Sequence, residues 1–526
     1  MQFQLLEQLY ASGRISRREF LKAAAALGAV TAIPGALSRH ARAAGPQRGG
    51  HFKLGIGSGH TGDSLDPSTW ASIFMNALGI SFGNCLTEVD GHGKLIPELA
   101  ESWEGLDGAK KWVFKLREGV TFHNGKAFGP EDVIATLELH RGEDSKSNQK
   151  ALLRPITELR GDGHHLHITL EQPNADFPYI LSSLYLPIMP ADGNGGVLLD
   201  GIGTGGYILR EFEPGVRALL ERNPDYWKTG RAHFDSVELL TISDVTARTT
   251  ALTTGEIHAM DRCELKTVHL LERDPEINVT RVPSGSHFTM PMNVHTPPFD
   301  NPDVRTALKL VINREEMLQK ILRGYGSIGN DHPIGPNLRF HAELPQRSYD
   351  PEQARALLKK AGMEGLSLDL STAEVFAGAN DAAILFKEQA AQAGIDINVV
   401  REPTDGYWSN VWMKKPWCMC YWMARSTADL MFSIGYTADA DWNDTGWNNA
   451  RFNELLLSAR AELDEARRAE MYREMQQLVR DDGGTPVLMF NDLVEAHRNT
   501  LAYEAPIASN WTSDGARMTE RWWFAA

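Results

Sequence analysis

A helix, a strand, a second helix and a second strand follow one another between residues 351 and 400, and this order constrains the fold more than any other feature of the chain. The first helix is predicted over 351–361, because Asp350 supplies an N-cap and Gly362 stands just past the end. A strand–helix–strand unit predicts a parallel pair of strands in an α/β fold. The later elements of the unit are expected at 366–370, 381–393 and 395–400.

Strand and helix patterns also alternate along the rest of the chain. Short strands are predicted at 52–56 and at 111–116, where apolar and polar residues alternate. Long helical patterns run over 302–322 and 451–480. We find no internal repeat and no low-complexity linker. The chain of 526 residues is therefore expected to form two to four domains. Each domain is expected to be built from several separate segments of the chain, rather than one domain following another.

Composition limits the classes of function. Lys and Arg number 53 against 68 Asp and Glu, which gives a net charge of −15 and argues against nucleic acid as a main partner. Four cysteines show no C-x-x-C spacing and allow at most one or two disulfide bonds, so a disulfide framework is excluded. These are Cys85, Cys263, Cys418 and Cys420.

The first 43 residues are predicted to be an export signal. Residues 16–22 read S-R-R-E-F-L-K, and an apolar run follows over 23–33. That run is too short to span a membrane, and Ala41-Arg42-Ala43 supplies an A-x-A cleavage site. The order is similar to that of a twin-arginine (Tat) signal. We therefore expect export to the periplasm, and Tat export implies that the protein folds before it is secreted.

Motifs that would suggest catalysis or a cofactor lack their structural context. Residues 201–206 match G-x-G-x-x-G, but a strand-like segment follows where a dinucleotide site needs a helix. His164, His165 and His167 are expected in a polar turn and on a solvated strand face, which argues against a metal site. The chain contains no H-E-x-x-H, G-x-S-x-G or P-loop motif. We expect no cofactor, no metal and no enzymatic activity.

Three stretches in a fixed order carry a family resemblance. Residues 99–103 read L-A-E-S-W, 112–126 read W-V-F-K-L-R-E-G-V-T-F-H-N-G-K, and 130–133 read P-E-D-V. Together they resemble the signature of the family 5 (peptide/nickel-type) solute-binding proteins of ABC importers. Further family landmarks follow in the same order at 203–207, 222–227 and 298–308.

The resemblance implies an α/β fold of the periplasmic-binding-protein-like kind (type II, cluster C). This fold has two mixed α/β lobes, with an extra subdomain inserted in the first. A ligand sits between the lobes, where hinge closure buries it and changes the shape that a permease meets. The expected division is a Tat-type signal over 1–43, lobe I over 44–75, 195–288 and 487–526, the inserted subdomain over 76–194, and lobe II over 289–486.

The implied function is that of the substrate-binding subunit of an ABC importer. Such a protein captures a dipeptide, oligopeptide or peptide-like solute and delivers it to the membrane permease; we expect it to act as a monomer. Relatives of the same fold carry opines, nickel complexes, haem or oligosaccharides, so the identity of the ligand stays open. Two further alternatives are an exported hydrolase, for which the chain offers no nucleophile with a base, and a periplasmic chaperone, which would bind denatured chains broadly.

Arg425 departs from the family pattern. Peptide-binding members place an acidic residue three positions after a Trp that matches Trp422, and that acid pairs with the α-ammonium of the ligand. Arg425 occupies the acidic position here. A guanidinium binds carboxylates in a bidentate manner and repels an ammonium, so the departure predicts an anionic group on the ligand. In the alternative interpretation, Asp429 neutralises Arg425 and the pair is structural.

Two segments are expected to hold the ligand. One is the aromatic-rich stretch 407–429 of the second lobe, and the other is the loop 57–61 after the opening strand of the first lobe. The predicted ligand-binding residues are Tyr407, Trp408, Trp422, Arg425 and Asp429 from the first segment, and Ser58 and His60 from the second.

Overall fold

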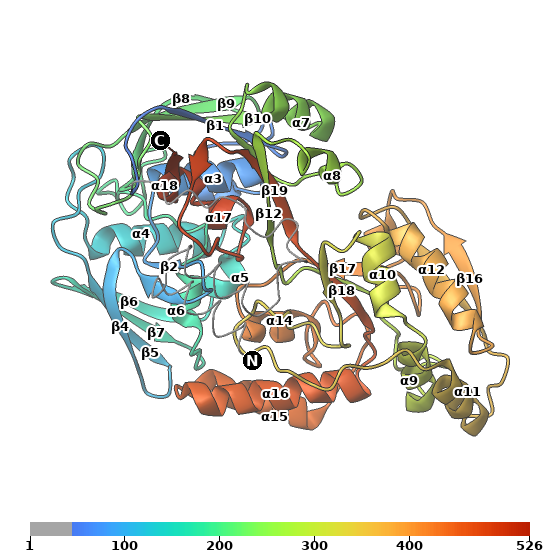
Figure 1. Ribbon diagram of the computed structural model, residues 1–526. Coiled ribbons are helices and arrows are strands. Elements are labelled where there is room, and N and C mark those ends of the chain that lie inside the picture. Colours follow the sequence, from blue (N-terminus) through green and yellow to red (C-terminus); the bar gives the residue numbers. More distant parts are fainter. Residues whose placement is uncertain (1–44, 526) are drawn as a thin grey trace, which may run out of the picture. The chain divides into compact units, whose positions relative to one another are not determined.

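Figure 1 shows the structure, a computed structural model that describes residues 45–525. The predicted export signal over 1–43 lies outside the described residues. Among the described residues, no helix combines the length and the apolar character that crossing a membrane requires.

The largest sheet has seven strands in the order β12-β19-β11-β1-β10-β9-β8. Strand β1 pairs in parallel with β10 and β11, and the other pairs are antiparallel. Helix α3 (Ile73–Phe82) packs into the core of this sheet, and we call the sheet, its helices and the C-terminal segment lobe I. The strands are β1 (His51–Ile56), β8 (Tyr207–Glu213), β9 (Arg217–Arg222), β10 (Ser236–Thr241), β11 (Ala259–Met260), β12 (Ile277–Val282) and β19 (Leu493–Arg498). The helices are α7 (Val245–Thr254), α8 (Val268–Leu271), α17 (Thr512–Ala516) and α18 (Met518–Arg521).

An inserted subdomain has its own four-stranded antiparallel sheet, in the order β4-β5-β7-β6, and its own hydrophobic core. That core begins at Leu86 and ends at Ile188, whereas we expected the subdomain to cover 76–194. On β7, His165 is exposed and His167 half-buried, as predicted for a solvated strand face. The elements are β2 (Thr87–Val89), β3 (Leu95–Pro97), β4 (Ala100–Leu106), β5 (Lys111–Leu116), β6 (Ile156–Asp162), β7 (His165–Leu170), α4 (Pro130–Arg141), α5 (Lys150–Leu153) and α6 (Phe177–Ile180).

Lobe II combines a four-stranded sheet, β14-β18-β13-β17, with the predicted strand–helix–strand unit. That unit is confirmed: β15 and β16 pair in parallel, and Asp350 caps α11 by accepting the N–H of Gln353 at 2.8 Å. The strands are β13 (His287–Thr289), β14 (Gly326–Ile328), β15 (Ser367–Thr372), β16 (Asp396–Arg401), β17 (Cys420–Trp422) and β18 (Val487–Asn491). The helices are α9 (Pro302–Leu310), α10 (Arg314–Ile321), α11 (Pro351–Lys360), α12 (Ala379–Ala391), α13 (Tyr407–Asn410), α14 (Ala428–Gly435), α15 (Ala450–Ala461) and α16 (Glu465–Asp482).

Each of the two long helical patterns is a pair of helices. The pattern over 302–322 divides into α9 and α10, because Asn313 caps α10 and accepts the N–H of Glu316 at 3.1 Å. The pattern over 451–480 divides into α15 and α16, because Asp464 caps α16 and accepts the N–H of Arg467 at 2.9 Å. The long helical patterns are therefore confirmed as helical, and the capping residues mark where each one is interrupted.

Two segments connect the lobes. The chain leaves lobe I after β12 and enters lobe II at β13, then returns from β18 to β19. The N–H of Asn491 donates to the carbonyl of Ser286 at 3.0 Å, so the two crossings run together. Strands β13 and β18 both belong to the sheet of lobe II, although we expected lobe II to span 289–486.

Candidate ligand-binding site between the lobes

Arg425 lies in the loop between β17 and α14, with its side chain half-buried. Its Nη1 donates to the carbonyl of the neighbouring Ala424 at 3.3 Å. Burial lowers the pKa of the guanidinium, and the titratable groups near it include the phenols of Tyr185 and Tyr421 and the imidazole of His287. Within residues 45–525 no carboxylate lies within salt-bridge distance of Arg425. The loop therefore presents a partly desolvated cation without an anion.

The opposite wall comes from lobe I and the inserted subdomain. The ring of Tyr185 lies 6.5 Å from the ring of Trp511, at an interplanar angle of 80°. Close by in the chain, Nδ2 of Asn337 in lobe II donates to Oγ of Ser509 at 3.4 Å. Arg425 therefore faces a wall built from segments that are far from it in the sequence.

That wall carries polar atoms that the protein leaves without partners. Residues 510–513 each bury one such side-chain atom: Oδ1 of Asn510, Nε1 of Trp511, Oγ1 of Thr512 and Oγ of Ser513. The next turn is left-handed, with φ of 54° at Ser513 and 58° at Asp514. A residue other than glycine is strained in the left-handed conformation, and such strained residues cluster at functional sites. Buried polar atoms normally have partners, so this segment is unusual among residues 45–525 in burying four of them without one.

Of the three predicted aromatic residues, two pack inside lobe II and the third lies at its surface. The Trp422 side chain is 4% exposed, and its ring lies 6.4 Å from Trp412 and 6.1 Å from Trp442. Tyr407 is buried, and its hydroxyl donates to the carbonyl of Met419 at 2.8 Å. Trp408 is 40% exposed and packs edge-on against the ring of Trp412. The density of aromatic residues in 407–422 therefore reflects packing.

Asp429 does not neutralise Arg425. It is buried in the first turn of α14, and its Oδ1 accepts from Nε of Arg460 at 2.8 Å. The alternative interpretation, a structural Arg425–Asp429 pair, is therefore corrected. Asp429 therefore has a protein cation, Arg460, as its partner.

The two predicted residues of lobe I are placed on its first loop. Oγ of Ser58 accepts the N–H of Ile73 at 3.0 Å, so this hydroxyl already holds the start of α3. His60 is exposed, and its backbone N–H donates to Asp63 at 2.9 Å. The structure shows no contact between these two residues and Arg425.

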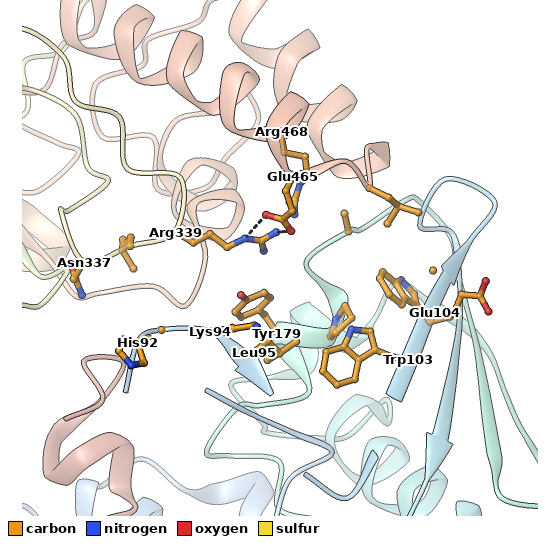
Figure 2. A pocket seen from close by; sticks show the side chains of 17 residues that line it. His92, Lys94, Leu95, Trp103, Glu104, Tyr179, Asn337, Arg339, Glu465 and Arg468 are labelled. Atoms are coloured by element: carbon orange, nitrogen blue, oxygen red, sulfur yellow. Dashed lines mark hydrogen bonds and ion pairs between the residues drawn. The ribbon is translucent and has the colours of Figure 1, made fainter. Parts of the chain in front are cut away.

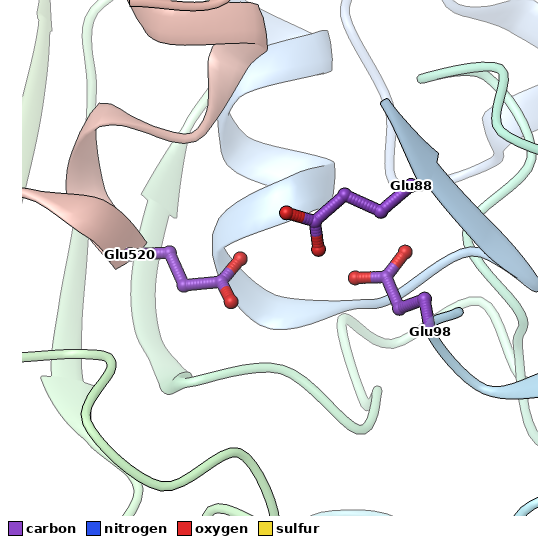
Figure 3. A group of neighbouring side chains, drawn as sticks. All are labelled: Glu88, Glu98 and Glu520. Carbon is purple, nitrogen blue, oxygen red and sulfur yellow. The ribbon is translucent and has the colours of Figure 1, made fainter. Parts of the chain in front are cut away.

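A buried group of three carboxylates is the one candidate metal centre that the described residues offer (Figure 3). Nζ of Lys228 lies 2.6 Å from an oxygen of Glu88, 2.6 Å from Glu98 and 2.9 Å from Glu520. Arg517 donates to Glu98 at 2.7 Å and adds a second positive charge. These carboxylates keep the pKa of Lys228 well above its usual value. The ammonium therefore supplies the positive charge that a metal would supply, and the group joins lobe I to the inserted subdomain.

No signal in the sequence identified Tyr185 or Trp511, which stand in segments without a motif.

The four cysteines are all free, and three of them are buried. The loop 201–206 precedes β8 rather than a helix, as predicted.

Comparison with known proteins supports a binding protein. Residues 94–444 match the family model described as bacterial extracellular solute-binding proteins, family 5 Middle. The chain is 27% identical over 475 residues to the glutathione-binding protein GsiB of Escherichia coli O6:K15:H31 (strain 536 / UPEC), covering 85% of this chain and 90% of that protein. It is 26% identical over 478 residues to di/tripeptide-binding protein 1 of Pseudomonas aeruginosa (strain UCBPP-PA14), covering 83% and 88%.

The fold is confirmed by solved structures. The periplasmic binding protein DppA of Helicobacter pylori, in complex with the peptide STSA, matches with a TM-score of 0.71 and 22% identity over 91% of this chain and 99% of that one. Residues 14–34 match the Tat-pathway signal sequence, so the predicted signal is confirmed and the protein is exported to the periplasm. The family model covers well over half of the chain, and the chain belongs to family 5 of the bacterial extracellular solute-binding proteins.

Proposed function

We propose that this protein is the substrate-binding subunit of an ABC importer. It captures a dipeptide, oligopeptide or peptide-like solute with an anionic group and delivers it, as a monomer, to the membrane permease. The glutathione-binding and di/tripeptide-binding relatives support the peptide class of ligand. The observation that carries the anionic group is the guanidinium of Arg425, half-buried between the lobes with no carboxylate partner in the described chain.

The physical reason is the cost of an unpaired charge in a desolvated place. Removing an ion from water is unfavourable unless an opposite charge or hydrogen bonds replace the lost solvation. A ligand carboxylate supplies both, because its two oxygens accept the parallel N–H groups of a guanidinium. An ammonium at the same place would be repelled. A free α-ammonium is therefore not the group that this site anchors.

The protein is proposed to bind and release its ligand without changing it. The described residues pair their buried carboxylates with Lys or Arg in several places, as at Lys228 and Arg460, and these groups are engaged in structure rather than poised beside a nucleophile. Ligand eluted after binding should therefore be recovered chemically unchanged. X-ray scattering should show compaction when ligand is added, because closure brings the lobes together.

Calorimetric titration of the mature protein tests the proposal. The panel is glutathione, Gly-Ala, Gly-Gly-Ala, the C-terminal amides of the two short peptides, and a nickel–histidine complex. We expect the free acids to bind about thirty-fold or more tighter than their amides, which corresponds to about 2 kcal/mol for one partner of a desolvated charge pair. Arg425→Ala should abolish this difference while leaving the melting temperature of the ligand-free protein close to that of the wild type. Equal affinity of acid and amide would refute the anionic group. Binding of the nickel complex alone would refute the peptide class.

A further inference from the structure

A second pocket, of about 860 Å³, lies between the inserted subdomain and lobe II (Figure 2). The subdomain contributes the β2–β3 turn, strands β4 and β5, and helix α6. Lobe II contributes the loop 337–339 and the start of α16. Because its two walls belong to different bodies, the pocket exists only while the subdomain and lobe II are in contact.

The wall of the pocket combines aromatic rings with positive charge. Trp103, Trp112 and Tyr179 line it from the subdomain. The guanidinium of Arg339 lies 5.1 Å above the ring of Tyr179, and its charge is already paired with Asp176 at 3.1 Å and with Glu465.

The side chains of two charged residues at the rim of the pocket, Lys94 and Glu104, point in different directions. Lys94 has no ion-pair partner among residues 45–525 and lines the pocket from the β2–β3 turn, as Tyr179 does from α6 (Figure 2). The carboxylate of Glu104 points away from the other labelled side chains (Figure 2). The uncompensated charge at the pocket is therefore positive, and it disfavours an ammonium.

Two polar atoms of the same wall lack partners. Nε1 of Trp112 has no acceptor among residues 45–525, although the Trp112 side chain is only 4% exposed. Oδ1 of Asn337 has no donor in the same part of the chain, while Nδ2 of this amide makes a long hydrogen bond of 3.4 Å to Ser509. Unpartnered buried polar atoms are rare in folded proteins. They mark this pocket as a place where a polar molecule completes the hydrogen bonding.

The pocket shares its walls with the site around Arg425. Tyr179 lines the pocket and Tyr185, six residues on, faces Arg425. Leu338 lines the pocket and also lies against Gly285, as Ala424 does next to Arg425. Leu338 of the pocket and Ala424 beside Arg425 lie against the same glycine, so the pocket and the loop of Arg425 are neighbours, within reach of a short extended peptide.

We propose that this pocket is the distal subsite of the ligand-binding site. It takes the end of a peptide-like ligand that is farther from Arg425, and it selects an aromatic, N-acylated end over a free ammonium. This inference rests on the proposed function, because Arg425 must hold the carboxylate end. The rings of Trp103 and Tyr179 stack on the distal side chain, and Lys94 favours acyl oxygens over a second positive charge.

Three peptides with a free C-terminal carboxylate test the proposal by calorimetric titration: Gly-Ala, Tyr-Gly-Gly-Gly-Ala and its N-acetylated form. The acetylated pentapeptide should bind wild-type protein about tenfold tighter than the free-amine form, and Lys94→Glu should remove that preference. Trp103→Ala should weaken both pentapeptides about three- to tenfold and leave Gly-Ala unchanged. Glu158→Gln, at an exposed position of β6 in the same subdomain that does not line the pocket, is the matched control and should change none of the affinities.

The outcomes separate this proposal from the one on which it rests. A loss that is equal for Gly-Ala and for the pentapeptides, or two pentapeptides of equal affinity, would overturn the distal subsite while the receptor function stands. If none of the three peptides binds wild-type protein, the peptide class of ligand fails first, and the distal subsite fails with it.

Discussion

Asp176 of the inserted subdomain is buried between two arginines of lobe II. Its Oδ1 accepts from Nη1 of Arg468 at 2.9 Å, and its Oδ2 lies 2.8 Å from Nη2 of the same guanidinium. Arg339 adds a contact at 3.1 Å. The side chains of Asp176 and Arg468 are only 4% and 2% exposed. This ion pair, with one hydrogen bond and one further close N···O contact, is the most deeply buried contact between the subdomain and lobe II that we describe.

The substitution Asp176→Ala is expected to weaken ligand binding. It leaves the Arg468 charge buried without its anion, and breaking a buried pair in this way typically costs ~3–5 kcal/mol. When the lobes separate, water reaches the guanidinium, so most of this cost falls on the closed state. A ligand that binds the closed state loses the same free energy, and ~3 kcal/mol corresponds to a loss of affinity of about 150-fold.

Calorimetric titration and X-ray scattering of the variant check this reasoning. The matched control is Glu474→Ala, which removes an exposed pair with Arg451 on helices of the same lobe and should change binding by less than about 1 kcal/mol. An affinity of Asp176→Ala within threefold of the wild type would refute the argument. A large drop in the melting temperature of the ligand-free variant with unchanged affinity would do the same, because the pair would then stabilise the fold and not the closed state.

Two further predictions concern export and pH. Replacing Arg17 and Arg18 by Lys should leave precursor in the cytoplasm in cell fractionation, and mature protein outside at normal levels would show that the Tat assignment is wrong. Desolvation raises the pKa of Asp444 to about 7, above its unfolded value of about 4, so the folded state binds an extra proton in this window and loses stability as pH rises through it. Asp444→Asn lacks this proton, so its melting temperature relative to the wild type should increase from pH 4 to pH 8. A difference independent of pH would contradict the assignment.

Local sequence signals predicted where helices and strands form. They did not predict which lobe or subdomain each of these elements packs into. The cap at Asp350 and the alternation of β1 depend on neighbouring residues, and both are present in the structure. Helix α3 was expected in the inserted subdomain from residue 76 on, yet it packs into lobe I. Nine of the ten residues of α3 are buried, so the helix has no exposed polar face. Without such a face, the sequence does not indicate which hydrophobic core the helix packs against. Its assignment depends on contacts with strands far away in the chain.

The sequence singles out one candidate site residue, at a position that departs from a motif. Arg425 is predicted to contact the ligand because the motif around Trp422 has an acid there, and this stays a prediction. Tyr185 and Trp511 were not singled out, because their role comes from the tertiary contact between them and not from their neighbours in the sequence. Trp422 and Tyr407 were expected in the site, but an aromatic side chain gains most by burying its ring, and the core of lobe II does that.

The loop that carries Arg425 and the buried contact at Asp176 are connected through protein. Arg425 precedes α14, and Asp429 in the first turn of that helix pairs with Arg460 at 2.8 Å. The carbonyl of Arg460 accepts the N–H of Ala175, the residue before Asp176, at 2.9 Å. We therefore expect the Asp176 contact and Arg425 to stabilise the same closed state of the lobes. The two differ in whether their effect depends on the chemistry of the ligand. The Asp176 contact is expected to stabilise closure around any ligand, because both of its partners are protein groups. Under the proposed function, Arg425 stabilises closure only when the ligand brings an anion. We infer that affinity common to all ligands comes from the first contact, and that selection among ligands comes from the second.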